Sequence, residues 1–361
     1  MLLIIADYPN EYNLREGTMQ RVDAIDSLIS DQKRVYLNLS FKKFIKRKIE
    51  IINNCTIENL NIFIHCKIIK AYLKEATSIY VHSVYNLLKI IKWVNLDKTI
   101  LDIHGVVPEE LLSDNKRIHY AIYNYVERKA VHNCKKLVHV TNAMVKHYEE
   151  KYNLSLSAKS IVLPIFEYKQ ISQDNTKWSG ELIRAVYVGG LQSWQNINKM
   201  VALCKSAHDN NTHCSYRFEF FVPQRDIELF KQQYSTDIIH CKANISTLTR
   251  EEIIPHLRKC HLGFVLRDDI VVNRVACPTK LVEYLECGVV PVVLSPHIGD
   301  FSELGYKYVT AASLEYQSLD LEQIKEMAQH NLLVLTEYQK RTFNAQQELI
   351  AELTQKICSY C

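Results

Sequence analysis

Short apolar runs alternate with longer stretches of helical spacing along this chain. Such runs favour buried strands, and apolar residues that recur every three or four positions favour helices. In the first half the predicted strands are Leu2–Ala6, Val35–Leu39, Ile62–Ile64, Ile79–Val81, Ile100–Ile103 and Leu137–Val140. In the second half the strands are Ala185–Val188, Phe218–Val222, Leu262–Leu266 and Val289–Leu294, with helices over Asn196–His208, Asp226–Gln233 and Arg250–Leu257. The alternation predicts an α/β protein with two parallel sheets covered by helices.

The chain length and one polar stretch predict two domains. A chain of 361 residues is long enough for two cores. The stretch from Ser172 to Gly180 is polar and lacks periodicity, so we place the boundary there. The predicted ranges are 1–171 for the first domain, 181–335 for the second and 336–361 for the end of a last helix that spans roughly Leu319–Ile357.

A strand-loop-helix unit from Leu262 to Val293 brings several charges together. Its helix is predicted over Thr279–Glu286, after Pro278 and before Gly288. The start of a helix offers unpaired N–H groups and the positive end of the helix dipole, which favour an anion. Full positive charges come from three residues, Arg267, Arg274 and Lys280. We predict a diphosphate site, with Glu283 one turn further on suited to the hydroxyl groups of a ribose.

Other candidate residues follow predicted strands, where open parallel sheets bind their ligands. Gly189 and Gly190 come after one strand and allow the backbone to approach a phosphate. His104 follows another strand next to Gly105, and strand alternation predicts that Asp102 points the opposite way. The structural alternative for His104 is a strand-end histidine bonded to a neighbouring loop.

Composition and charge narrow the functional class. Residues 1–165 hold 24 Lys and Arg against 17 Asp and Glu, and the remainder holds 20 Lys and Arg against 23 Asp and Glu. The positive excess in the first half favours an anionic partner for that half. Eleven cysteines, at CxxC spacing only in Cys358 and Cys361, favour free thiols in a reducing cytosol. No metal site is predicted, since His208, His213 and Cys214 lack a partnering pair at ligand spacing. Neither a signal peptide nor a membrane span is predicted, and no nucleic-acid, GxGxxG or P-loop motif occurs.

A basic segment from Phe41 to Ile52 has apolar residues at helical spacing. Its cations are Lys42, Lys43, Lys46, Arg47 and Lys48. We predict an amphipathic helix that lies on an anionic membrane surface. The alternatives are a solvated face of a core helix and, less favoured by the mild overall charge, a contact with nucleic acid.

The segment LRDDIVVNRVACPTKLVEYLECGVVPVV closely resembles a motif of retaining GT-B glycosyltransferases, of the family 4 type that assembles bacterial O-antigen and capsule. Weaker likeness extends over REGTMQRV, ILDIHGVVPEE, VERKAVHNCKKLVHVTNAM and YVGGLQSWQNI. The resemblance implies two Rossmann-like domains facing a central cleft and a C-terminal helix that crosses back to the first domain. It also implies that His104 contacts the transferred sugar, and that the loop with Gly17 and Arg21 faces the acceptor. Glu109 is a further acceptor candidate, although helix-start chemistry also explains it.

Three departures from the broader family matter. Its usual pair of glutamates, eight positions apart, survives only at Glu283, because Val275 stands at the first position. Two cations expected after the first strand of the second half are replaced by Gly190 and Gln195. The diphosphate charge then has to be met by the cations of the 262–293 unit.

These observations predict a metal-independent, retaining glycosyltransferase. It moves a sugar from a UDP- or GDP-type sugar nucleotide, which is a substrate and not a cofactor, to a polyprenyl-linked saccharide of O-antigen, lipopolysaccharide or capsule biosynthesis. The protein is expected in the cytoplasm, peripherally bound to the inner face of the cytoplasmic membrane. Arg267, Lys280 and His104 would be catalytic. The alternatives are a non-catalytic GT-B-like subunit that binds a nucleotide or a partner, and a sugar-nucleotide epimerase or hydrolase.

Overall fold

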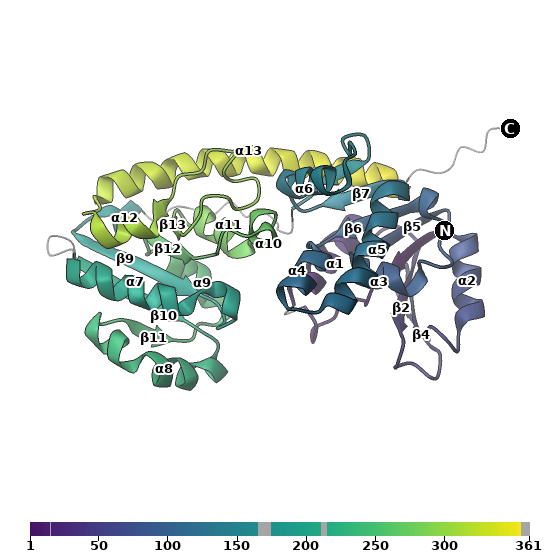
Figure 1. Cartoon of the computed structure of the whole chain (residues 1–361), viewed down its shortest axis with the longest axis horizontal. Coiled ribbons are helices and arrows are strands. Elements are labelled where there is room, and N and C mark those ends of the chain that lie inside the picture. The colour runs from purple at the N-terminus through teal and green to yellow at the C-terminus, as the bar shows by residue number, and fades with distance from the viewer. Residues whose placement is uncertain (15, 165–174, 211–214, 355–361) are drawn as a thin grey trace. The chain divides into compact units, whose positions relative to one another are not determined.

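The computed structural model of the chain describes residues 1–14, 16–164, 175–210 and 215–354 (Figure 1). It divides into two compact units, Met1–Glu167 with Arg341–Cys361 and Tyr168–Lys340, and each unit has its own sheet. The predicted domain ranges, 1–171, 181–335 and 336–361, stay predictions.

The first unit contains an eight-stranded sheet in the order β3-β4-β2-β1-β5-β6-β7-β8. Each neighbouring pair is parallel except β3 and β4. The strands are β1 (Leu2–Ile5), β2 (Arg34–Ser40), β3 (Lys48–Ile52), β4 (Cys55–Asn61), β5 (Ser78–His82), β6 (Thr99–Ile103), β7 (Lys136–His139) and β8 (Ser160–Val162). The helical segments are α1 (Gly17–Leu28), α2 (Cys66–Glu75), α3 (Ser83–Ile90), η1 (Leu96–Lys98), α4 (Val107–Ser113), α5 (Arg117–Asn133) and α6 (Asn142–Tyr152).

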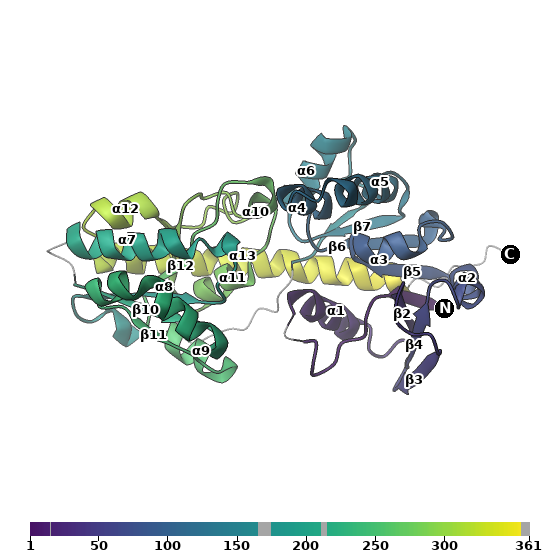
Figure 2. The same cartoon turned by 60° about the horizontal axis from the view of Figure 1, so that its bottom comes forward.

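Helices lie on both faces of this sheet (Figure 2). One face shares an apolar core with Val22 and Ile25 of α1 and with Leu349 near the chain's end. The strands are nearly continuous in apolar residues, as β1 with Leu2–Ile5 shows, because a sheet covered on both sides leaves neither face in water.

One predicted strand, Ile62–Ile64, is wrong. The strand of this region is β4, which ends at Asn61, and Ile62 lies in the turn that follows. The apolar pattern missed β4 because the strand carries a buried carboxylate, Glu58, which accepts hydrogen bonds from Arg47 and Tyr72. A buried charge with partners is tolerated in a strand, but it interrupts the alternation on which the prediction rests.

The amphipathic helix predicted from Phe41 to Ile52 is also wrong. Residues 41–47 form a loop, and β3 then pairs with β4 in an antiparallel hairpin. The two residues between the strands are Asn53 and Asn54, and Asn53 has a φ of 51°, which asparagine tolerates in tight hairpin turns. Pairing with β4 outweighs the helical spacing of the isoleucines, whose branched side chains favour strands.

The second unit contains a six-stranded sheet in the order β11-β10-β9-β12-β13-β14, with parallel pairs throughout its described strands. The strands are β9 (Leu182–Val188), β10 (Ser215–Phe221), β11 (Asn244–Ser246), β12 (Leu262–Val265), β13 (Val290–Val293) and β14 (Val309–Thr310). The helical segments are η2 (Asn175–Trp178), η3 (Ser193–Gln195), α7 (Ile197–Asn210), η4 (Gln224–Asp226), α8 (Ile227–His240), α9 (Arg250–Leu257), α10 (Val271–Arg274), α11 (Thr279–Glu286), α12 (Ala311–Tyr316) and α13 (Leu321–Thr354). Helices α9 and α11 have the predicted bounds.

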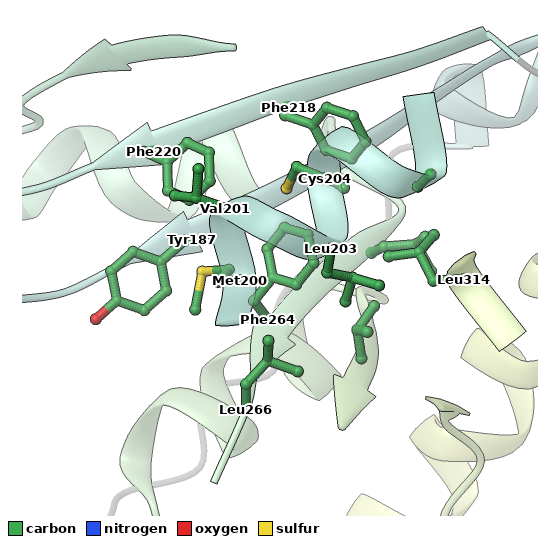
Figure 3. Packing of buried hydrophobic residues seen from close by; sticks show 14 of the residues in the cluster. Tyr187, Met200, Val201, Leu203, Cys204, Phe218, Phe220, Phe264, Leu266 and Leu314 are labelled. Atoms are coloured by element: carbon green, nitrogen blue, oxygen red, sulfur yellow. The ribbon is translucent and has the colours of Figure 1, made fainter. Parts of the chain in front are cut away.

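The core of the second unit lies between its sheet and α7 (Figure 3). Phe218, Phe220 and Phe264 from the strands meet Met200 and other apolar residues of α7, and all of these side chains are buried. Tyr187 belongs to the same core, but its hydroxyl group points out of it (Figure 3). The packed sheet thus fixes the ring of Tyr187, and its hydroxyl group lies outside the core.

The last helix, α13, contributes to the cores of both units. Ile324 and Ala328 near its start pack in the second unit, and Leu349 and Leu353 near its end pack in the first. Lys135 Nζ lies 2.7 Å from Glu352 Oε2 in the first unit. None of the described helices is both long and apolar enough to span a bilayer.

Candidate functional site

In the second unit, Lys280 lies against the glycines that follow β9. Its ammonium group is 4.0 Å from the ring centroid of Tyr187 and donates a hydrogen bond to Gln195 Oε1 at 3.1 Å. A Cβ atom at Gly189 would be 2.7 Å from Lys280 Nζ, and the φ of Gly189 is 155°, so this position requires glycine. The structure therefore brings the predicted Gly189 and Lys280 together.

Gly190 completes this turn. Its carbonyl oxygen accepts a 2.6 Å hydrogen bond from the Tyr187 hydroxyl group, and a Cβ atom here would be 2.7 Å from Gln192 Nε2. The hydroxyl group of Tyr187 thus fixes the backbone of the turn, while the face of its ring contacts the ammonium group of Lys280.

Arg267 is the second cation of this cluster, which we call the cation pair, Arg267 and Lys280. It follows β12 and is partly buried. The charge of Arg267 acts to lower the pKa of Lys280 and opposes the rise in the pKa of Tyr187 that burial causes. Neither Arg267 nor Lys280 has a carboxylate within ion-pair distance among the described residues. Burial, followed by the charge of Arg267, lowers the pKa of Lys280 to about 7. Burial likewise lowers the pKa of Arg267.

Two partly buried cations that repel each other are electrostatically unfavourable without an anion. Lys280 is the second residue of α11, whose N-cap residue, Pro278, offers no side-chain cap. The N–H groups of the first turn and the helix dipole favour negative charge at the same place. The cation pair and the start of α11 therefore form a site suited to a phosphate group.

Glu283 lies one turn beyond Lys280 and is exposed to solvent. Partial desolvation by the surrounding protein raises the pKa of its carboxyl group, while the charges of Lys280 and Arg250 oppose this rise. Solvent access leaves the carboxylate available to accept hydrogen bonds from a ligand.

Arg274 differs from the sequence-based expectation. Its Nε lies 2.5 Å from Asp269 Oδ1, and both side chains are about half exposed. The charge that was predicted to meet a diphosphate is thus offset by a neighbouring carboxylate on the surface. Residues 271–274 form the short helix α10, which the sequence pattern had placed in a loop.

In the first unit, Asp102 is the centre of a buried polar cluster, which we call the Asp102 cluster: Arg21, His82, Asp102 and His104. Arg21 donates to both carboxylate oxygens, at 2.7 to 3.0 Å, and also to the backbone oxygens of Leu163 and Pro164. Burial alone would raise the pKa of Asp102, but Arg21 and then His104 hold it well below its ordinary value. Asp102 is therefore an anion that can only accept hydrogen bonds.

The ionised Asp102 contacts two histidines. His82 Nδ1 and His104 Nε2 each lie 3.2 Å from Asp102 Oδ2 and 3.2 Å from each other, so a proton on either nitrogen can be donated to the carboxylate. Burial lowers the pKa of His82 to about 4, which keeps that ring neutral. The opposite nitrogen of His104, Nδ1, is buried and has no hydrogen-bond partner among the described residues, while 10% of the side chain is exposed. When the proton is on Nε2, Nδ1 is left as an acceptor for a ligand hydroxyl group.

Two expectations for this region are corrected. Asp102 does not point away from His104, because the two residues are two positions apart and residues at that spacing along a strand point to the same face; the expectation misapplied the alternation. Arg21 is buried and bonded to Asp102, so its geometry gives it a positioning role and not the predicted acceptor contact.

Gly17 and Glu109 are placed differently from each other. Gly17 begins α1, and a Cβ atom there would meet nothing within 4 Å. Glu109 Oε1 lies 2.6 Å from Lys151 and 3.3 Å from His147, which ties it to α6. Its neighbour Glu110 instead contacts Gly105, where a Cβ atom would collide with Glu110 Oε1. Burial, followed by the charge of Glu109, raises the pKa of Glu110.

Two groups of described residues have the composition of metal ligands. The first is His82, Asp102 and His104, and the second is Glu219, His256 and Cys260. Both carboxylates already have partners, since Asp102 binds Arg21 and Glu219 lies 3.1 Å from Arg217. Of the zinc alternative weighed on the sequence, His213 and Cys214 lie outside the described residues.

Sequence reasoning missed three participants: Tyr187, Gln195 and His82. His82 ends β5 beside β6, so the rule that residues after neighbouring parallel strands meet could have found it. Gln195 was noted only as the replacement of a cation. Tyr187 was hidden in an apolar strand.

Solved structures with similar folds were found over nearly the whole chain. Trehalose-6-phosphate synthase OtsA is 11% identical with a TM-score of 0.64, and each chain is 99% covered. A structure described as trehalose-6-phosphate from E. coli, bound with UDP-2-fluoro glucose, is 12% identical with a TM-score of 0.61 and 99% of each chain covered. WaaG, a glycosyltransferase involved in lipopolysaccharide biosynthesis, is 11% identical with a TM-score of 0.54, over 99% of this chain and 96% of WaaG.

The fold is that of the GT-B glycosyltransferases. The predicted fold class, α/β with two Rossmann-like sheets, is confirmed. No protein-family model and no curated protein matches the chain. At 11–12% identity these likenesses show the fold, and the activity has to be argued from the site.

Proposed function

We propose that this protein is a glycosyltransferase that uses a nucleotide diphosphate sugar as donor. The observation that carries the proposal is the cation pair, partly buried at the start of α11 without a carboxylate partner among the described residues. In a protein with the GT-B fold, the anion expected to bind at such a site is a nucleotide diphosphate. A similar structure is bound with UDP-2-fluoro glucose.

Each residue of the site has a defined task in this proposal. Lys280 and Arg267 bind the diphosphate and stabilise the negative charge that grows on it as the sugar departs. Gly189 and Gly190 let the backbone approach the phosphates, and Glu283 accepts hydrogen bonds from the ribose. The Nδ1 atom of His104 accepts a hydrogen bond from a hydroxyl group of the transferred sugar. The two cations supply the charge that a divalent metal supplies in other transferases, so the reaction needs no metal.

The finer assignments belong to the same proposal. We assign the protein to the retaining family 4 type, on the resemblance of the 262–293 segment. The acceptor is a polyprenyl-linked saccharide of O-antigen, lipopolysaccharide or capsule biosynthesis, and the protein works at the inner face of the cytoplasmic membrane. The similar structure of WaaG, a glycosyltransferase of lipopolysaccharide biosynthesis, supports this direction.

A thermal-shift screen of UDP- and GDP-sugars identifies the donor, because a ligand that binds only the folded protein raises its melting temperature.

With that donor, the rate of sugar transfer is then measured for Arg267→Ala, Lys280→Ala and the matched variant Arg274→Ala. Each lost charge-assisted contact costs roughly 1.5–3 kcal/mol, so the first two variants lose transfer by about one to two orders of magnitude. Arg274→Ala loses less, since Arg274 is already paired with Asp269. Wild-type turnover in both Arg267→Ala and Lys280→Ala would remove the basis of the proposal.

His104→Ala separates sugar contact from nucleotide binding. His104 belongs to the first unit and the donor contacts belong to the second. The variant should bind nucleoside diphosphate like the wild type, while its rate of sugar transfer falls.

Nucleotide release that depends on an added acceptor distinguishes a transferase from an epimerase or hydrolase. It also distinguishes a transferase from a non-catalytic GT-B-like subunit, which shows no release.

A further inference from the structure

Two turns of the first unit expose large apolar side chains next to lysines. We call them the basic apolar surface: residues 41–47, which follow β2, and residues 62–65, which follow β4. Ile45 is 71% exposed and Phe63 is 69% exposed, and Phe41 and Ile64 are also exposed. Side chains of this kind in water are unfavourable, and their clustering marks an interaction site.

The surface is preformed by one buried residue, Asn61. Its Nδ2 donates to the backbone oxygens of Phe41 and Lys43, at 3.4 and 2.9 Å. Its Oδ1 accepts from the backbone N–H groups of Phe63 and Ile64, at 3.0 and 3.2 Å. The rings of Phe41 and Phe63 lie 5.9 Å apart as a result. Asn61 thus holds both turns together with their apolar side chains outward.

Positive charge at this surface is uncompensated. Lys42, Lys43 and Lys46 are exposed and form no ion pair among the described residues. The two carboxylates of the adjoining strands are already engaged, since Glu50 pairs with Lys48 and Glu58 with Arg47. The free lysines therefore favour an anionic partner.

We propose that the basic apolar surface docks the protein on an anionic lipid bilayer. Phe41, Ile45, Phe63 and Ile64 enter the interface, and Lys42, Lys43 and Lys46 meet the headgroups. Aromatic and aliphatic side chains beside lysines match the chemistry of that interface, where an apolar layer lies directly beneath negative charge. The docking element is a pair of turns that Asn61 holds together, and not the helix expected from the sequence.

The surface shares an edge of the sheet with the Asp102 cluster. Strands β2 and β4 are parallel to β5 and β6, so all four strands end at the same edge. In the strand order, β2 is three positions from β6, which is roughly 14 Å at the usual strand spacing. Figure 2 shows β2, β3 and β4 on one side of this unit. Docking here brings the membrane surface near His104, and this consequence for a lipid-linked acceptor rests on the proposed function.

Co-sedimentation with vesicles tests the docking. The probes are phosphatidylcholine vesicles with and without phosphatidylglycerol, at low and high salt. Wild type is compared with Lys42→Glu/Lys43→Glu/Lys46→Glu and with Phe41→Ser/Phe63→Ser. Matched controls are taken from the second unit: Lys231→Glu/Lys242→Glu/Lys259→Glu, all exposed lysines, and Leu229→Ser/Ile239→Ser, two exposed apolar residues of α8.

Wild type should bind only the vesicles that contain phosphatidylglycerol, and salt should weaken this binding. Reversing three lysines should lower vesicle affinity by roughly 100-fold or more, and the Phe41→Ser/Phe63→Ser variant should also lose binding. Both controls should bind like the wild type. Donor binding by calorimetry should be unchanged in every variant, so a failure of docking is distinguishable from a failure of the proposed function.

Several outcomes would overturn the proposal. Equal binding of the wild type and the lysine variant would remove charge complementarity, as would equal binding to vesicles without phosphatidylglycerol. Retained binding of Phe41→Ser/Phe63→Ser would exclude insertion of the turns. If wild type self-associates without vesicles and Phe41→Ser/Phe63→Ser abolishes this, a second copy covers the surface instead.

Discussion

At the scale of single residues, Lys280 couples electrostatics to ligand binding. Burial and the nearby Arg267 lower its pKa to about 7 in the protein without ligand. A bound diphosphate brings negative charge next to the ammonium group, which raises the pKa again. The charged form of Lys280 is therefore favoured by the donor and disfavoured by the protein alone.

The affinity for the intact donor should consequently depend on pH. Below pH 7 Lys280 is already charged, so affinity stays constant. Above pH 7 binding has to take up a proton, and affinity should fall by about tenfold for each pH unit. Calorimetry of the intact sugar nucleotide, whose diphosphate does not titrate in this range, measures the effect. Lys280→Arg is the control, because a guanidinium group stays charged and should remove the dependence. A flat profile in the wild type would contradict the role of Lys280.

The Asp102 cluster shows what single-residue reasoning could not foresee. The sequence identified His104 from its place after a strand, but its chemistry depends on the neighbouring Asp102 and on Arg21 and His82, which come from two other places in the chain. Contacts between residues as far apart as 21 and 102 depend on the packing of α1 against the sheet. Sequence patterns contain no direct signal of such contacts.

At the scale of elements, helix α11 carries two contacts on one face. Lys280 and Glu283 are three residues apart, so they project from neighbouring positions of one helix, displaced along its axis by roughly 4.5 Å. This spacing lets one helix bind both the phosphate and the ribose of a nucleotide. The helix was predicted with its bounds because a proline, a regular apolar stripe and a glycine stop all agree.

Glu283→Gln tests this division along α11. The variant should weaken nucleoside diphosphate by about tenfold or more, since hydrogen bonds to a charged group are worth roughly 1.5–3 kcal/mol. Inorganic pyrophosphate, which has no ribose, should bind equally well or better, because the variant removes a negative charge near Lys280. Calorimetry with the two ligands provides the comparison. Parallel weakening of both would instead mean that Glu283 acts only by holding the charge of Lys280.

The sequence pattern predicted the strands whose buried residues are apolar and missed a strand that buries polar side chains. Strands such as β1, with its four buried apolar residues, were found because parallel strands covered on both faces are continuous in apolar residues. Strand β4 was missed because Glu58 and Asn61 are buried with partners from other elements. Strand β3 was taken for a helix because its pairing with β4 is a tertiary contact.

At the scale of the whole molecule, α13 is a structural part of both units. The chain reaches the first unit's core a second time through Leu349 and Leu353, and Lys136 Nζ lies 3.2 Å from Glu348 Oε1 at the same place. The first unit is therefore completed only by the end of the chain. Its stability should depend on residues that follow the entire second unit in sequence.

Leu349→Ala measures this dependence. Leu349 is fully buried in the core shared with α1 and β1, and removing such a side chain typically costs about 2–5 kcal/mol of unfolding free energy. Leu333→Ala is the control in the same helix, because Leu333 is 70% exposed and its removal should change stability by no more than about 0.5 kcal/mol. Chemical denaturation should show earlier unfolding of the first unit in Leu349→Ala, while nucleoside diphosphate binding, which belongs to the second unit, persists at low denaturant. If Leu349→Ala unfolds at the same denaturant concentration as Leu333→Ala, the end of α13 is not part of the first unit's core.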